Sequence, residues 1–90
     1  MYEWDEAKRR ANLAKHGVDF ADMSRFDWDS SLHIATDVLE FEQREVALGI
    51  LDFEVVVVCY TERDERTRII TLRKATKREE KLFYASRAPH

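Results

Sequence analysis

Basic side chains and a few carboxylates gather in the last third of the chain, between Glu62 and Lys81. This stretch holds eight Lys or Arg residues against five Asp or Glu. Three of the arginines could hold phosphate as fixed guanidinium forks: Arg63, Arg68 and Arg73. Three side chains could carry protons: Glu62, Glu79 and His16. Cleavage of RNA by its own 2′-hydroxyl uses such groups, because a base takes the 2′ proton, a cation stabilises the phosphorane charge and an acid protonates the leaving 5′-oxygen.

Each of these side chains also has a structural explanation that the sequence leaves open. Arg63 and Arg68 fit solvated charges beside a turn, and His16 fits a cation that complements the end of a helix. Glu79 fits better as the capping partner of Thr76, in the pattern S/T-x-x-E. The net charge of −3 gives no global case for nucleic-acid binding. Any site for a polyanion must therefore be local.

Other kinds of site find little support in the sequence. The three histidines have no metal-ligand spacing, and a single cysteine cannot make a zinc site. That cysteine, Cys59, lies inside an apolar run, where we expect it to be buried. Gly17 and Gly49 are the only glycines, so the chain has no glycine-rich phosphate loop, and no serine stands in a G-x-S-x-G elbow. We therefore expect no metal and no cofactor.

Length and composition indicate one soluble domain that spans residues 1–90. Ninety residues suffice for a single core, and the chain is 44% hydrophobic and 37% charged. One cysteine permits no internal disulfide, which fits a reducing compartment. No apolar stretch approaches membrane-spanning length, and no signal peptide precedes the charged start. We expect a cytoplasmic protein without a membrane partner.

The pattern of apolar residues predicts the strands that must position the site. Residues 55–60 (VVVVCY) form an unbroken apolar run, which is typical of a strand covered on both faces. Residues 61–66 are too charged to bury and predict a turn, and residues 67–73 predict a second strand, so the two form a hairpin. Gly49 predicts a bulge or a close backbone approach. Two earlier segments with alternating patterns predict further strands: residues 32–36 at an edge, and residues 44–50.

Three helices are predicted from their caps. Asp5 is placed to cap a helix over residues 6–16, which Gly17 ends in a left-handed conformation. Similar signals predict two further helices: residues 20–26, and Thr76 to about residue 86. The small apolar residues of the first helix are expected to face a sheet or a second helix: Ala7, Ala11, Leu13 and Ala14.

The order of these elements predicts an α+β domain. It has two N-terminal helices, a four-stranded antiparallel sheet and a C-terminal helix, with the helices on one face of the sheet. Residues 2–4 are too few to classify, although their pattern allows a short strand. Residues 88–90 are expected to fray.

Several motifs, taken together, resemble one known family. They are Trp4-Asp5-Glu6-Ala7-Lys8, Asn12-Leu13-Ala14-Lys15-His16-Gly17-Val18 with Phe20, Tyr60-Thr61-Glu62-Arg63, Arg68-Ile69-Ile70-Thr71, and Arg73-Lys74-Ala75-Thr76 with Glu79. Across nearly the whole chain these motifs resemble the BrnT family of type II toxins, small ribonucleases of the RelE-like superfamily. The chain departs from the family in residues 29–43, which lack the usual Asp-Pro, at Leu72, where the family usually has Ala, and in its acidic balance.

The resemblance implies a RelE-like sheet flanked by helices and cleavage of messenger RNA that halts translation. It also implies neutralisation by a BrnA-like antitoxin with a ribbon-helix-helix part. DNA would then be bound only through the antitoxin.

The sequence therefore supports a first hypothesis and a rival. In the first, the chain is a metal-independent endoribonuclease with five candidate catalytic residues: Glu62, Arg63, Arg68, Arg73 and His16. Three lysines are expected to bind the RNA: Lys15, Lys74 and Lys77. In the rival hypothesis, the chain is a non-catalytic module that binds its antitoxin and acts in operon autoregulation. The acidic composition favours the rival, whereas the clustering of arginines on one hairpin favours the enzyme.

Overall fold

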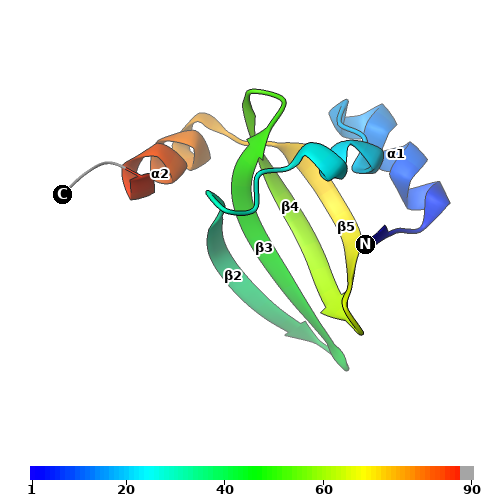
Figure 1. Cartoon of the computed structure of the whole chain (residues 1–90). Coiled ribbons are helices and arrows are strands. Elements are labelled where there is room, and N and C mark those ends of the chain that lie inside the picture. The colour runs from blue at the N-terminus through cyan, green and yellow to red at the C-terminus, as the bar shows by residue number, and fades with distance from the viewer. Residues whose placement is uncertain (88–90) are drawn as a thin grey trace.

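The computed structural model describes residues 1–87 and builds them around one sheet (Figure 1). In chain order the elements are β1 (Tyr2–Glu3), α1 (Glu6–His16), the 3₁₀ helix η1 (Phe20–Arg25), β2 (Leu32–Leu39), β3 (Glu42–Leu51), β4 (Glu54–Arg63), β5 (Arg66–Lys74) and α2 (Lys77–Arg87). The predicted α+β class is confirmed. The expected fraying of residues 88–90 concerns residues outside the described ones. No helix in the described part is long and apolar enough to cross a membrane.

The sheet has five strands in the order β1-β5-β4-β3-β2. Strands β2 to β5 pair antiparallel as successive hairpins, which confirms the predicted meander and the edge position of β2. The prediction of only four strands was wrong, because β1 pairs in parallel with β5 and places Glu3 opposite Arg68. A two-residue strand carries too little pattern to reveal its partner or its direction.

The turn between β4 and β5 is tighter than the sequence predicts. Only Asp64 and Glu65 lie outside the strands, and both have positive φ, 51° and 66°. Two successive left-handed residues form the backbone of a type I′ turn, whose twist suits the flanking strands. This turn sets Arg63 directly opposite Arg66.

Both faces of the sheet carry a core. The core on the η1 face is the larger and includes Phe20, Met23, Ala47, Val56, Val58, Ile69 and Leu72. The core on the α2 face includes Leu48, Val55, Val57 and Phe83. Residues 55–58 thus alternate between two cores, which confirms that this strand is covered on both sides. The prediction that all helices lie on one face was wrong, because α2 inserts the fully buried Phe83 into the opposite face.

Helix α1 lies along the β5 edge and is held by a polar clamp. Its alanines and Leu13 are exposed, so the predicted inward-facing stripe was wrong, and Asn12 is the buried residue of the helix. Asn12 Nδ2 donates to the carbonyl oxygens of Leu72 (2.7 Å) and Val18 (3.2 Å), and Asn12 Oδ1 accepts from the Leu72 N–H (3.3 Å). Because β1 is too short to pair with this part of β5, the amide takes the place of a neighbouring peptide group.

The predicted caps of α1 and the close approach at Gly49 are present. Asp5 accepts a hydrogen bond from the Lys8 backbone N–H, and Gly17 ends α1 with a φ of 72°. A Cβ atom on Gly49 would lie 2.2 Å from Cζ of Phe26, so the aromatic ring rests directly on the strand backbone. The second helix, predicted without a type, is a 3₁₀ helix.

The helices gather at one end of the sheet. In Figure 1, α1, η1 and α2 surround the upper part of the strands, whereas the β2–β3 and β4–β5 turns project below them. We name this lower part the bare half; it comprises residues 33–37, 42–46, 59–63 and 66–71. The two surfaces described next belong to it, except for Arg73, which lies farther along β5.

Candidate functional site

A bulge in β5 decides which side chains of the last hairpin share a face. The pairing of β4 with β5 shifts by one residue between Cys59 and Tyr60, which leaves Ile70 as an extra residue in β5. Arg68 and Arg73 are five residues apart, and in a regular strand they would point to opposite faces. The extra residue shifts the alternation of side chains by one position, so Arg68 and Arg73 both lie on the α2 face.

Five arginines therefore occupy the α2 face. Arg63 lies opposite Arg66, and Arg68 lies opposite Thr61. In β3, Arg44 lies two residues before Val46, which packs on the α2-face core, so alternation places Arg44 on the same face. We name this surface the arginine face; it comprises Arg44, Arg63, Arg66, Arg68 and Arg73.

Two arginines of this face form no ion pair within residues 1–87. Arg44 pairs with Glu42 (Nε to Oε2, 3.0 Å), and Arg66 approaches Glu3 (Nη1 to Oε2, 3.7 Å). Within residues 1–87, Arg63 and Arg68 form no ion pair with a carboxylate. Their guanidinium groups are exposed and available to an external anion.

Arg73 differs from the other arginines because it is tied to α2. Its two terminal nitrogens donate to the two carboxylate oxygens of Glu79 at 2.8 and 2.9 Å. Glu79 also accepts from the Thr76 N–H at 2.8 Å, and its own N–H donates to Thr76 Oγ1 at 3.2 Å, which confirms the capping box. Chiefly through the Arg73 hydrogen bond, the pKa of Glu79 falls to about 2. Arg73 thus fixes the end of β5 to the start of α2.

Strand β1 adds a carboxylate to the arginine face. Glu3 is the register partner of Arg68 and the ion-pair partner of Arg66, so it lies on the same face as both arginines. The sequence analysis missed both Glu3 and Arg44. Alternation with Val46 could have revealed Arg44, whereas no local pattern reveals the partner of β1.

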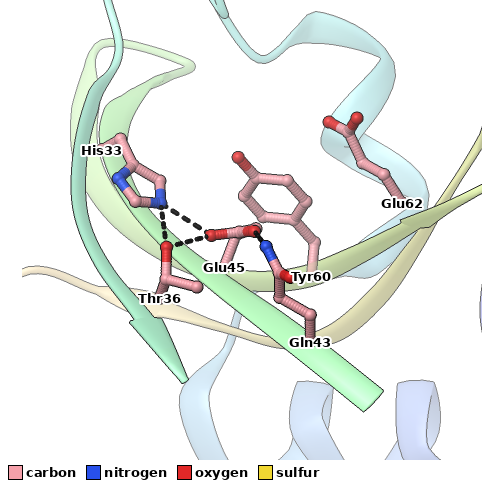
Figure 2. A pocket seen from close by; sticks show the side chains of 6 residues that line it. All are labelled: His33, Thr36, Gln43, Glu45, Tyr60 and Glu62. Carbon is pink, nitrogen blue, oxygen red and sulfur yellow. Dashed lines mark hydrogen bonds and ion pairs between the residues drawn. The ribbon is translucent and has the colours of Figure 1, made fainter. Parts of the chain in front are cut away.

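Glu62 lies on the other face of the sheet. Adjacent residues of a strand point to opposite sides, so Glu62 points to the η1 face while Arg63 points to the α2 face. There Glu62 borders an open cavity of about 490 Å³ (Figure 2). We name this cavity the carboxylate pocket; it is lined by His33, Thr36, Gln43, Glu45, Tyr60 and Glu62.

A hydrogen-bond network on adjacent strands shapes the carboxylate pocket. Glu45 Oε1 accepts from Thr36 Oγ1 at 2.6 Å and lies 2.8 Å from His33 Nε2, while Glu45 Oε2 accepts from Gln43 Nε2 at 2.8 Å. These hydrogen bonds, that of Thr36 foremost, lower the pKa of Glu45 to about 2, so the group is an anion at neutral pH. Burial raises the pKa of the Tyr60 hydroxyl. The sequence analysis did not find this pocket, because the register of β2 against β3 is required to assemble it.

His16 lies far from Glu62 and from Arg63 and Arg66 at the β4–β5 turn. One turn before His16, Asn12 bonds to Leu72, whereas Glu62 lies opposite Thr67. Thr67 and Leu72 are five positions apart, which corresponds to roughly 16 Å of strand. His16 therefore belongs to neither surface of the bare half.

The three lysines expected to bind RNA are dispersed over three elements. Lys15 is exposed near the end of α1, and Lys77 is the first residue of α2. Lys74 ends β5 and pairs with Glu54 at 3.5 Å. The structure thus brings the arginines together but not the lysines.

Comparison with known families covers nearly the whole chain. Residues 4–79 match the family model described as "Ribonuclease toxin, BrnT, of type II toxin-antitoxin system". The chain belongs to the BrnT family. This confirms the resemblance drawn from the sequence, and membership in a type II system implies an antitoxin partner. The BrnT match includes all five arginines of the arginine face and every residue of the carboxylate pocket, but not Glu3. A search among curated proteins found no match.

Proposed function

We propose that this BrnT chain is a metal-independent endoribonuclease that cleaves RNA and thereby inhibits translation. The observation that carries the proposal is the arginine face. It gathers five guanidinium groups on one face of a chain whose net charge is −3. Within residues 1–87, Arg63 and Arg68 leave their charges unpaired. A local cationic surface of this kind favours a polyanion even where the whole chain is acidic.

In this proposal Arg63 and Arg68 hold the scissile phosphate. A guanidinium group offers parallel N–H donors to two phosphate oxygens and cannot lose its proton at neutral pH. As the 2′-oxygen attacks phosphorus, negative charge develops on the phosphorane oxygens, and a fixed guanidinium stabilises it. The 5′-oxygen leaves with a proton from a general acid or from water. The products are a 2′,3′-cyclic phosphate and a 5′-hydroxyl.

The proton acceptor that best suits this geometry is Glu3. Its carboxylate lies on the arginine face, beside Arg66 and Arg68. Glu62 points to the opposite face, and His16 lies beyond the far end of the clamp at Leu72. Arg73 serves as a positioning residue in this scheme, because its guanidinium is already bonded to Glu79.

We also propose that the antitoxin is BrnA-like, binds DNA through a ribbon-helix-helix part, and covers the arginine face with an acidic segment. Three arginines of this face pair with carboxylates of the chain itself. The guanidinium groups of this face can therefore bind carboxylates. A segment bound there would exclude RNA and neutralise the toxin.

The proposal is tested with purified toxin and a defined RNA in the presence of EDTA. We expect cleavage that leaves 2′,3′-cyclic phosphate and 5′-hydroxyl ends, and growth arrest on induction that co-expression of the antitoxin relieves. Cleavage that stops with EDTA and returns with Mg²⁺ would contradict the metal-free mechanism. A chain that binds its antitoxin but neither cleaves RNA nor arrests growth would favour the non-catalytic module.

A further inference from the structure

In the carboxylate pocket, the donors that surround Glu45 are already directed at its carboxylate. Thr36 and Gln43 donate to Glu45, and His33 Nε2 is directed at the same carboxylate. Figure 2 shows these three side chains converging on Glu45 from β2 and β3. Three groups in the pocket remain available to a ligand and can accept a hydrogen bond from it: the Glu62 carboxylate, the Gln43 carbonyl and the Tyr60 oxygen.

Tyr60 is the second observation that points to a ligand. It is only 7% exposed, yet it lines the cavity, and within residues 1–87 its hydroxyl makes no hydrogen bond to another side chain. Its ring packs edge-on against Trp28, with ring centroids 4.9 Å apart, so the side chain is fixed in place. No fully buried side-chain oxygen or nitrogen among residues 1–87 lacks a hydrogen-bond partner, so the unbonded Tyr60 oxygen lies at the surface of the cavity, where a ligand can reach it. The pocket supplies the space for one.

The charge of the pocket selects the kind of ligand. Glu45 is held as an anion, and within the described residues Glu62 has no ion-pair partner. Two carboxylates facing one cavity repel phosphate and attract a cation. A metal ion is a poor candidate, because no three His, Cys, Asp or Glu among residues 1–87 are arranged to bind one.

We propose that the carboxylate pocket binds an arginine side chain of the antitoxin. A guanidinium group carries five N–H donors in a planar fork, which suits the Glu62 carboxylate, the Tyr60 oxygen and the Gln43 carbonyl. The aromatic ring of Tyr60 can also receive the cation. The choice of the antitoxin as donor rests on the type II pairing that the BrnT family implies. The antitoxin then contacts two faces of the toxin with opposite charges.

The binding chemistry can be tested without RNA and without the antitoxin. The probe is N-acetyl-arginine amide, with N-acetyl-citrulline amide as its neutral isostere and inorganic phosphate as the anion. Backbone amide shifts of isotope-labelled toxin are followed during each titration. We expect the arginine probe to shift residues 33–36, 43–45 and 60–62, citrulline to bind about tenfold more weakly, and phosphate to shift residues of the arginine face instead. Phosphate shifts centred on the pocket, or arginine shifts centred elsewhere, would overturn the proposal.

Variants of the toxin identify the groups that bind the probe. Glu62→Gln should weaken the arginine probe about tenfold, because a charge-assisted hydrogen bond is lost. Tyr60→Phe keeps the packed ring and should weaken it a few-fold. Glu65→Gln, a matched change on the adjacent turn outside the pocket, should leave the affinity as it was. Equal effects of the changes at Glu62 and Glu65 would mean that only long-range charge attracts the probe, and would overturn the pocket.

The same variants test the partner. In pull-downs with the cognate antitoxin, Glu62→Gln should raise the dissociation constant about tenfold while Glu65→Gln leaves it unchanged. If Glu62→Gln binds the antitoxin as tightly as the wild type does, the arginine that occupies the pocket does not come from the antitoxin. These measurements are independent of cleavage, so a toxin without ribonuclease activity would still support or refute the pocket.

Discussion

The two faces of the bare half are built from the same strands but carry opposite charge. On the α2 face, Arg63 and Arg68 leave their charges available to an anion. On the η1 face, Glu45 and Glu62 line a cavity in which Thr36 and Gln43 already donate to Glu45. The faces are separated only by the thickness of one sheet. Helix α2 and η1 pack at the other end of the sheet (Figure 1), so no helix within residues 1–87 covers either surface, although Arg73 at the edge of the arginine face bonds to α2.

The difference between the faces follows from strand alternation. In β3 and in β4, acidic and basic residues are neighbours in sequence: Arg44 beside Glu45, and Arg63 beside Glu62. Because successive side chains point to opposite faces, the acidic and the basic member of each pair lie on different faces of the sheet. A net charge of −3 therefore conceals one basic and one acidic surface. This explains how an acidic chain can belong to a ribonuclease family.

The largest expected effect is on RNA cleavage after Arg68→Lys. Lysine keeps the charge but cannot present a bidentate fork to the phosphate. The loss of one fixed donor to the transition state typically costs roughly 2.7–4 kcal/mol, or about a hundred- to a thousandfold in rate. Cleavage of a defined RNA is measured at constant salt, together with growth arrest on induction.

Arg10→Lys is the matched control for this substitution. Arg10 lies on α1 with its side chain 75% exposed, away from both faces of the bare half. The Arg10→Lys variant should cleave RNA at the wild-type rate. If Arg68→Lys also retains full activity, the arginine attracts RNA only through its charge, and the role of its fork is refuted.

The next largest effect tests whether the η1 face can be disturbed without the arginine face. Gly49→Ala places a Cβ atom against Phe26, which packs against Trp28, which in turn packs against Tyr60. Overpacking of this kind costs about 1–3 kcal/mol of unfolding free energy. Urea denaturation measures this loss, and titration with N-acetyl-arginine amide should show weakened binding at the pocket. Phosphate binding to the folded variant should be retained; its loss would show that the two faces are coupled.

The sequence predicted the elements of this fold better than it predicted the faces. Caps specified α1 and α2, and the apolar run specified a strand buried on both sides, because these signals are local. The bulge at Ile70 is not local: it depends on how β4 and β5 pack together. It decides that Arg68 and Arg73 share a face. The parallel pairing of Glu3 is equally non-local, which is why the candidate base was sought in Glu62.

A smaller effect is expected from Glu79→Gln, which tests whether Arg73 is a positioning residue. The pKa of Glu79 is lowered from 4.5 to about 2, so the stability that its charge contributes is present above pH 4.5 and is lost as the pH falls towards 2. Because Arg73 is 39% exposed, solvent screening reduces this contribution to about 1 kcal/mol. Urea denaturation at pH 7 and pH 3 should show the variant less stable than the wild type at pH 7, with that difference reduced to roughly half at pH 3.

Glutamine at position 79 retains the cap and so isolates the charge. Since Glu79 does not contact the phosphate in our scheme, the variant should remain an active ribonuclease. A variant with wild-type stability and no cleavage would instead place Glu79 in the reaction.

The closest comparison of the two faces comes from neighbouring residues of β4, and the smallest expected effect is that of Glu62→Gln. Arg63→Gln and Glu62→Gln each remove one charge, at positions adjacent in sequence but on opposite faces. Arg63→Gln should slow RNA cleavage about tenfold or more, because a charge-assisted hydrogen bond to phosphate is lost. Glu62→Gln should change the rate by less than about threefold, since an exposed charge on the far face acts only through screened attraction. If Glu62 is the general base, its loss should instead cost roughly a hundred- to ten-thousandfold. That result would mean that the RNA reaches around the end of the sheet to the η1 face.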